Sequence, residues 1–305
     1  MSPRPFVAGL AICTLLLSSS CTKDNSKQAG NPNGDSGATK ILRFSAIPDE
    51  NTTEQSAKFK KIADYLSRTL GVNVEFVPAA DYGASVDKFV NGEIHLAWFG
   101  GLTGVQARAE VDGARAIAQG IEDPNYISYF IANADTGLEL SESFPAAIKD
   151  MKFTFSSKTS TSGRLMPSFF IEKETGIEAI KWFANPVGFS GAHDKTAKLV
   201  EAGTFQAGVL SYKKYDSMVE NGDLDAAKCR VIWKTPAYSD YNWTARPDLD
   251  VIFGGGFIDK LQEALIEIDD PALLKALTRS RLIPANNDDF QGIVDVARQL
   301  KLLNH

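Results

Sequence analysis

The sequence has little positive charge and few residues of the kinds that bind metals. Its 38 Asp and Glu residues outnumber 32 Lys and Arg residues, which gives a net charge of −6 over 305 residues. No basic run marks a nucleic-acid surface, so we expect no nucleic-acid partner. The three histidines, His95, His193 and His305, offer no metal cluster at these positions. We therefore expect neither a bound metal nor another cofactor.

Two common enzyme motifs are also missing. No glycine-rich phosphate loop carries a lysine, and the hydroxyl-rich stretch at residues 160–163 reads STSG, not G-x-S-x-G. A triad of Ser162, His193 and an aspartate remains an alternative, which would make the protein a serine hydrolase. The missing motifs favour a protein that is not an enzyme.

Cysteine is scarce, and two of the three cysteines lie near the start of the chain. Residues 1–21 combine Arg4, an apolar run over residues 6–17 and small residues that lead to Cys21. This pattern is typical of a secretory signal peptide, and Cys21 resembles the modified cysteine of a bacterial lipoprotein. Leu17 stands one position too early for the usual lipoprotein signal, so ordinary cleavage nearby stays open. With the first cysteine removed and Cys21 lipidated, Cys229 has no partner for an intramolecular disulfide.

The next stretch, residues 22–40, contains almost nothing apolar and is rich in Gly, Asn, Ser and Lys. Such a composition predicts a flexible tether. A lipidated cysteine, a tether and a globular domain together predict a protein held at the outer surface of a membrane. We expect it in the periplasm or at the cell surface.

Beyond residue 40, strands and helices alternate. Apolar runs at residues 41–47 and 74–77 flank a segment with helical spacing at 53–70, which predicts a βαβ unit with parallel strands. An extended crossing at residues 126–132 follows, and the alternation restarts at 153–155. The other predicted elements are strands at 94–99, around Trp182, at 207–210 and, as the return strand, at 231–234, and helices from 81–83 and near 103–110, 164–174 and 195–202.

This pattern predicts an α/β protein with two lobes and a ligand cleft between them. We expect lobe 1 over residues 41–130, lobe 2 over 131–235, and a return to lobe 1 with C-terminal helices over 236–305. Ligands of open α/β sheets bind beyond the carboxyl ends of the strands. The cleft is therefore expected where those ends meet.

A group of hydroxyl residues follows the strand predicted at 153–155. Ser160, Thr161 and Ser162 come just before an apolar segment that we expect to be helical. Hydroxyls and free backbone amides at a helix start converge at the positive end of the helix dipole, which binds anions. The same residue types also serve as ordinary helix caps. The sequence leaves both interpretations open.

Several segments, taken in order and with their spacing, resemble a known family. They are FSAIPDEN (44–51), DYG (81–83), NGEIHLAWFGGLTG (91–104), STSG (160–163) followed by Pro167 and Ser168, and GAHD (191–194) before VEAG (200–203). Over residues 41–300 the chain resembles periplasmic binding proteins of the phosphonate, phosphite and phosphate class, which deliver ligand to ABC transporters. Within that class it is most similar to the binding proteins of selenate transporters.

The resemblance implies a two-lobed periplasmic binding protein of type II that is the solute-binding component of an ABC importer. A permease in the inner membrane would be its partner, and such proteins usually act as monomers. The ligand would be a small tetrahedral oxyanion: selenate, phosphite, phosphate or phosphonate. A subunit that reports to a membrane sensor is the alternative, because it would use the same ligand-bound clamp.

The resemblance also implies which residues bind the ligand. Tyr82 would donate its phenol from lobe 1, while the hydroxyls and amides at Ser160, Thr161 and Ser162 and the imidazole of His193 would donate from lobe 2. The walls implied by the resemblance are Tyr126, Tyr129, Tyr241 and Trp243. A buried anion needs donors more than bulk charge, since a hydrogen bond to a charged group contributes about 1.5–3 kcal/mol.

One departure from the family pattern bears on the ligand. Many relatives place an acidic residue in the strand after the histidine, where it accepts a proton from the ligand, and the corresponding position here is Leu210. A pocket without an acceptor favours a fully ionised oxyanion such as selenate. Asp49, Glu50 and Asp240 stay open as other sources of an acceptor.

Overall fold

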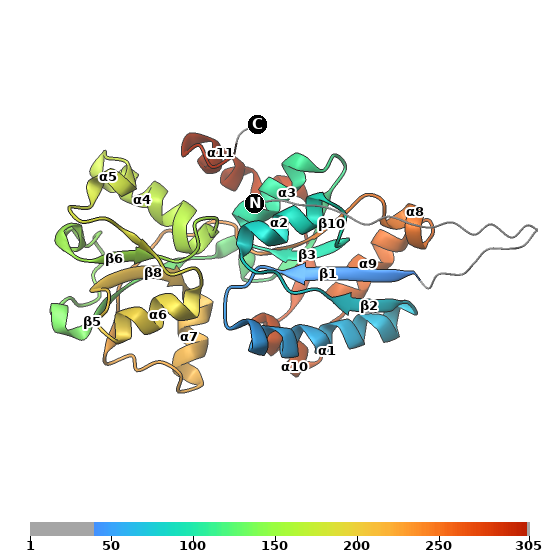
Figure 1. Cartoon of the computed structure of the whole chain (residues 1–305), viewed down its shortest axis with the longest axis horizontal. Coiled ribbons are helices and arrows are strands. Elements are labelled where there is room, and N and C mark those ends of the chain that lie inside the picture. The colour runs from blue at the N-terminus through green and yellow to red at the C-terminus, as the bar shows by residue number, and fades with distance from the viewer. Residues whose placement is uncertain (1–39, 304–305) are drawn as a thin grey trace, which may run out of the picture. The chain divides into compact units, whose positions relative to one another are not determined.

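The computed structural model describes residues 40–303, which form two α/β lobes, each built around its own sheet (Figure 1). The signal peptide expected over residues 1–21 and all but the last residue of the tether expected over residues 22–40 lie outside the described residues. Among residues 40–303, no helix combines the length and the apolar character needed to span a bilayer. The expected limits of the lobes stay predictions, and each lobe is described below by the sheet that it contains.

Lobe 1 surrounds a six-stranded sheet. Its strands are β1 (Ile41–Ala46), β2 (Asn73–Phe76), β3 (Leu96–Phe99), β4 (Arg115–Gly120), β10 (Asn242–Ala245) and β11 (Leu282–Pro284), in the order β11-β4-β10-β3-β1-β2. Its helices are α1 (Thr52–Leu70), α2 (Tyr82–Val90), α3 (Gly101–Glu110), α8 (Leu249–Phe253), α9 (Phe257–Ile266), α10 (Pro271–Leu277) and α11 (Gln291–Gln299). Strand β1 is parallel to both β2 and β3, as the βαβ pattern predicts.

Lobe 2 surrounds a five-stranded sheet. Its strands are β5 (Ser128–Asn133), β6 (Phe153–Phe155), β7 (Gly188–Phe189), β8 (Ala207–Ser211) and β9 (Cys229–Lys234), in the order β7-β6-β8-β5-β9. Its helical segments are a π-helical turn η4 (Thr161–Leu165), α4 (Met166–Thr175), α5 (Ala179–Trp182), α6 (His193–Glu201) and α7 (Tyr212–Glu220).

The local signals in the sequence account for the helices beside the cleft. Helix α1 buries Phe59, Ile62 and Leu66 on one face and ends at Gly71, which adopts a left-handed conformation with φ of 68°. Helix α2 begins after Asp81, whose side chain accepts a hydrogen bond from the Ala84 amide. These two helices place the loops that follow β1 and β2 at the cleft.

Two sequence expectations are wrong. The segment around Trp182 is the short helix α5, in which Ala179 and Trp182 are buried three residues apart, as one helical turn requires. The lobe 2 strand that follows is β7, at the edge of the sheet. The run at 231–234 is not the return strand, because β9 pairs with β5 inside lobe 2. The return strand is β10, which inserts antiparallel between β3 and β4.

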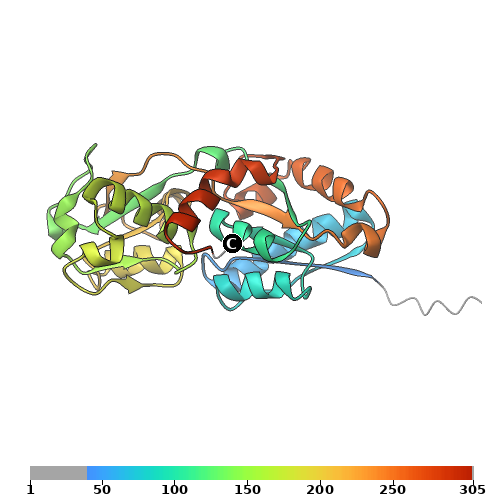
Figure 2. The same cartoon turned by 90° about the horizontal axis from the view of Figure 1, so that it is seen from above.

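Two chain crossings connect the lobes, one between β4 and β5 and the other between β9 and β10. An antiparallel β-bridge joins the two crossings. The Tyr126 amide donates to the Tyr238 carbonyl at 2.8 Å, and the Tyr238 amide donates to the Tyr126 carbonyl at 3.0 Å. Figure 2, turned by 90°, shows α11 near the junction of the lobes. The residues after it share a surface pocket with Arg164 and Ser168 of lobe 2.

A buried ion pair fixes the first crossing to lobe 1. Asp123 accepts hydrogen bonds from Nε of Arg279 at 2.9 and 3.0 Å, and both side chains are almost fully buried. The guanidinium also lies over the rings of Tyr241, Tyr126 and Trp98, at 4.7–5.4 Å from their centroids. The Asp123 carbonyl accepts from the Asp240 amide at 3.0 Å, so the same residue also holds the second crossing.

We expect Asp123→Asn to lower the free energy of unfolding by about 3–5 kcal/mol, because it leaves the buried Arg279 charge uncompensated. Urea denaturation at neutral pH measures the effect. The control is Asp64→Asn, which breaks an ion pair with Lys60 whose side chains are 51% and 71% exposed and costs less than about 1 kcal/mol. Equal losses in the two variants would contradict a stabilising role for the buried pair.

Candidate ligand-binding site

Ser160 forms the cap of the helical segment that follows β6. Its hydroxyl accepts a hydrogen bond from the Gly163 amide at 3.0 Å. The first turn is π-helical, with the Leu165 amide donating to the Ser160 carbonyl, a form often found at functional sites. A Cβ at Gly163 would lie 2.4 Å from the Ser156 Cβ, so only glycine fits there. The capping interpretation therefore holds for Ser160.

The next residue, Thr161, reaches across to lobe 1. Its hydroxyl accepts from the Leu102 amide at 2.9 Å, in the first turn of α3. The neighbouring Gly101 amide donates to Oδ1 of Asp240 at 2.8 Å. A Cβ at Gly100 would lie 3.1 Å from the Thr161 hydroxyl, so a glycine lets the two lobes approach closely. The amides at the start of α3 thus bind side chains from lobe 2 and from the second crossing.

Ser162 and Tyr82 each present a buried hydroxyl with no partner within the described protein. Ser162 lies in the turn η4 of lobe 2, and Tyr82 is the first residue of α2 in lobe 1. Burial raises the pKa of Tyr82 well above its usual value, and the carboxylates of Asp49 and Asp240 raise it further. Tyr82 therefore keeps its proton and acts as a donor.

His193 opens α6 and is fully buried. Its Nδ1 lies 3.1 Å from the Ser156 hydroxyl and 3.4 Å from the Ser211 amide. Because an amide can only donate, Nδ1 accepts and the proton resides on Nε2, which has no partner in the described chain. Burial, and then the charge of Lys214, lowers the pKa of His193 to about 3. The imidazole is therefore a neutral donor.

Asp240 brings a carboxyl group to these donors. Its Oδ1 accepts from Gly101, while its Oδ2 is buried without a partner among the described residues. Burial raises the pKa of Asp240 to about 7, while the Gly101 amide and the nearby Thr161 and Ser162 hydroxyls oppose that rise. The Ser162 hydroxyl lies close to the carboxyl group but does not meet hydrogen-bond geometry with it. This residue is thus a buried acid that titrates close to neutrality.

The sequence left open whether Asp49, Glu50 or Asp240 supplies an acceptor, and the structure shows how each of these carboxylates is engaged. The side chain of Leu210 packs in an apolar cluster of lobe 2, so the acceptor does not come from that position. Both oxygens of Asp49 are engaged, by Tyr241 at 3.0 Å and by Gln55 at 3.3 Å. Glu50 forms ion pairs with two lysines. Of the three carboxylates left open by the sequence, Asp240 has the free oxygen beside the donors.

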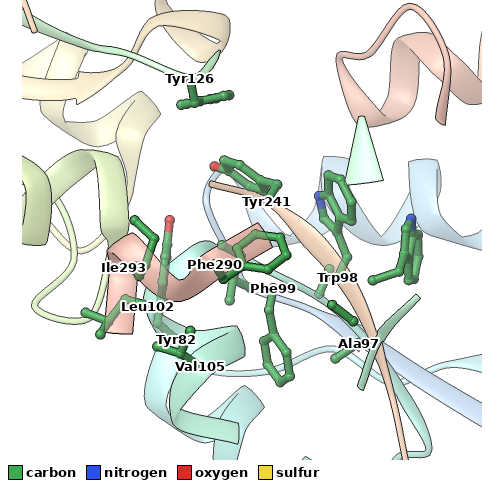
Figure 3. Packing of buried hydrophobic residues seen from close by; sticks show 14 of the residues in the cluster. Tyr82, Ala97, Trp98, Phe99, Leu102, Val105, Tyr126, Tyr241, Phe290 and Ile293 are labelled. Carbon is green, nitrogen blue, oxygen red and sulfur yellow. The ribbon is translucent and has the colours of Figure 1, made fainter. Parts of the chain in front are cut away.

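The structure divides the aromatic residues that were expected to form the walls. Tyr126 and Tyr241 lie together with ring centroids 5.4 Å apart, and the Tyr126 hydroxyl contacts that of Ser211. In Figure 3, Tyr82 points its hydroxyl away from Val105, toward the side on which Tyr241 and Tyr126 lie. These three tyrosines form one aromatic lining.

Tyr129 and Trp243 lie elsewhere. Tyr129 packs with Leu210 and Tyr215 in the separate apolar cluster of lobe 2. Trp243 is fully buried in the core of lobe 1 against Phe44. We therefore leave both out of the proposed site.

The arrangement suits binding and not hydrolysis. Three donors (the hydroxyls of Tyr82 and Ser162 and Nε2 of His193) and one carboxyl oxygen of Asp240 are buried with no partner in the described protein. Each such group costs about 1–3 kcal/mol if nothing satisfies it, so the set calls for a small polar ligand. In the described chain the Ser162 hydroxyl and Nε2 of His193 have no hydrogen-bond partner, so the two do not form the nucleophile and base of a triad.

The chain is similar to proteins of known class along most of its length. A family model described as "ABC transporter, phosphonate, periplasmic substrate-binding protein" matches residues 44–290. The probable ABC transporter phosphite binding protein PhnD1 of Prochlorococcus marinus (strain MIT 9301) is 34% identical over 268 residues, which are 86% of this chain and 90% of the relative. The phosphate-import protein PhnD of Mycolicibacterium smegmatis is 31% identical over 84% of this chain and 79% of its own length.

The same class is found among solved structures. The structure of PhnD1 from Prochlorococcus marinus in complex with methylphosphonate has a TM-score of 0.81 to this chain at 35% identity, covering 86% of this chain and 99% of the other. A binding protein component of an ABC phosphonate transporter from Pseudomonas aeruginosa has a TM-score of 0.75 at 19% identity and supports the fold.

Capping and ligand binding are separable by two single substitutions. We expect Ser162→Ala to weaken phosphite binding by roughly 10- to 150-fold, because it removes a donor to a charged group, while the unliganded protein keeps its stability. Ser160→Ala is expected to cost about 1 kcal/mol of stability, because it removes the cap, with a smaller loss of affinity. Calorimetric titration and thermal unfolding without ligand measure the two effects. The assignment is wrong if Ser160→Ala loses only affinity and Ser162→Ala only stability.

Proposed function

Because this chain belongs to the family of periplasmic substrate-binding proteins of phosphonate ABC transporters, we propose that its cleft binds a small tetrahedral oxyanion carrying one proton. Phosphite and simple alkylphosphonates fit this description, whereas sulfate and selenate are fully ionised near neutral pH. Members of this family are not enzymes, so the protein delivers its ligand unchanged to a membrane permease. PhnD1 of Prochlorococcus marinus is described as a probable phosphite binding protein, and its solved structure is a complex with methylphosphonate. Both support a singly protonated oxyanion as the ligand class.

The observation that carries the proposal is the buried, unpartnered Oδ2 of Asp240, a carboxyl group that acts on Tyr82 and lies near the Ser162 hydroxyl. Tyr82, Ser162 and the neutral His193 would donate to ligand oxygens that carry charge. Asp240 would accept the proton of the remaining P–OH group. A fully ionised oxyanion has no proton to offer, so it would face a carboxylate across the pocket unless Asp240 is itself protonated.

The pH dependence follows from the pKa of Asp240. Its value of about 7 lies above the usual range for an aspartate, because burial disfavours the charged form. Between the ordinary value and about 7 the folded protein binds more protons at this group than the unfolded chain does. This carboxyl therefore lowers stability as pH rises through that window. Sulfate and selenate should lose affinity as pH rises above about 7, where Asp240 of the folded protein ionises, since their binding requires neutral Asp240.

We expect Asp240→Asn to reverse the selectivity of the site. At pH 8, one pH unit above the pKa of Asp240, the unaltered protein must protonate this carboxyl group before selenate binds. Asparagine removes that cost, so the affinity for selenate should rise about tenfold. The affinity for phosphite should fall, because an amide oxygen accepts the hydrogen bond of the P–OH group less strongly than a carboxylate oxygen does. Calorimetric titrations with both anions at pH 6 and 8 measure this, with Asp64→Asn as the control for loss of an acidic charge. Tight selenate binding by the unaltered protein at pH 8 would count against a proton-reading acceptor.

We also propose that the protein acts as a monomer anchored through a lipidated Cys21, which lies outside the described residues. In a bacterial host, Cys21→Ser should move the protein from the membrane fraction to the soluble periplasmic fraction. Cys13→Ser, in the same leader, is the matched control and should leave the protein in the membrane fraction. Recovery of the unaltered protein in the soluble fraction would rule out the anchor, and light scattering tests the monomer.

A further inference from the structure

A carboxylate at the mouth of the cleft binds two lysines, one from each lobe. Glu50 lies in the loop after β1, and its Oε2 is 2.7 Å from Nζ of Lys58 on α1 and 2.5 Å from Nζ of Lys214 on α7. The side chains of Glu50 and Lys214 are both only 9% exposed, whereas Lys58 is 36% exposed. The pair with Lys58 lies within lobe 1, and the pair with Lys214 joins lobe 1 to lobe 2.

We propose that Lys214 is a positioning residue: its ion pair with Glu50 holds the lobes together and places His193 against the ligand. This rests on the proposed function of the cleft, because it assumes that the ligand binds between the lobes.

The contacts around Lys214 connect it to His193. Ser211 caps α7 by accepting from the Lys214 amide at 3.3 Å, and the Ser211 amide faces Nδ1 of His193 at 3.4 Å. On the other side of the cleft, the His193 amide donates to the Asp49 carbonyl at 3.1 Å. Because Asp49 and Glu50 are adjacent in the chain, the ion pair and this backbone bond hold the same lobe 1 loop, one through α7 and the other through the start of α6. Together they fix the start of α6 relative to lobe 1.

The two lysines differ in what happens when the lobes separate. Lys58 and Glu50 belong to the same lobe, so opening the cleft leaves their ion pair intact. Lys214 loses Glu50 on opening and returns to water. The free energy of the Lys214 pair therefore contributes to closure, whereas that of the Lys58 pair contributes equally to the open and closed states.

The charges nearby support this assignment. Asp49, Glu50 and Asp194 all act on Lys214 and raise its pKa against the effect of burial. Asp194 belongs to lobe 2 and remains near Lys214 after opening, but Asp49 and Glu50 belong to lobe 1. Removing Lys58 leaves a simple one-to-one pair between Glu50 and Lys214, which should close at least as well as before. The two substitutions therefore have different expected outcomes at one carboxylate.

The test compares Lys214→Met with Lys58→Met in the purified protein, using phosphite as the probe. Lys214→Met should weaken phosphite binding about tenfold or more, mainly through faster dissociation, and leave the unfolding midpoint of the unliganded protein unchanged. Lys58→Met should bind phosphite within about twofold of the unaltered protein. Lys214→Arg keeps the charge and should recover most of the affinity. Stopped-flow kinetics and thermal unfolding measure these effects.

Equal losses of affinity in Lys214→Met and Lys58→Met, or no recovery in Lys214→Arg, would overturn the proposal. If the unaltered protein binds none of phosphite, methylphosphonate, sulfate and selenate, the proposed function fails and closure is tested directly. Small-angle X-ray scattering of the unliganded protein should then give a larger radius of gyration for Lys214→Met than for Lys58→Met. Equal radii would overturn the role of Lys214 independently of any ligand.

Discussion

The burial of one carboxyl group among hydrogen-bond donors is the constraint on which the rest of the site depends. Asp240 comes from the second crossing, Tyr82 from lobe 1, and Ser162 and His193 from lobe 2, and each presents a buried polar atom without a partner in the described protein. No lobe supplies the complete set. Closed lobes would assemble the complete set and a ligand would satisfy it, so in the proposed mechanism binding and closure stabilise each other.

The buried ion pair between Arg279 and Asp123 positions the residues of the proposed site that belong to lobe 1 and the crossings. Arg279 pairs with Asp123 and lies over Tyr126 and Tyr241, two of the rings that line the cleft. The backbone of Asp123 in turn holds Asp240. The ion pair thus fixes the crossings, the aromatic lining and the acceptor relative to lobe 1. In the proposed mechanism, closure would bring Ser162 and His193 of lobe 2 to the residues held by lobe 1.

The sequence predicted most of the helices and strands that carry the proposed site. It did not predict which of the candidate residues lie together there. Helical spacing and capping residues identified α1 and α2, and the strand before Ser160 was placed correctly. Tyr126 and Tyr129 belong to different parts of the chain, because Tyr129 lies in β5 whereas Tyr126 precedes that strand and forms the bridge with Tyr238. The sequence offered Asp240 only as one of three possible acceptors, because its place beside the start of α3 depends on β10 entering the first sheet. An apolar run does not reveal its pairing partner, which is why β9 was mistaken for the return strand.

Selectivity in such a site is a matter of proton count more than of shape, since tetrahedral oxyanions have similar dimensions. His193, with a pKa of about 3, and Tyr82, with a pKa raised well above its usual value, keep the same protonation state across the physiological range. Asp240 alone of the residues lining the proposed site has a pKa near neutrality. In the proposed site, the pocket and its ligand could therefore share one proton near neutral pH. A ligand that brings this proton leaves Asp240 charged and paired, whereas one without it forces the carboxyl to take a proton from water.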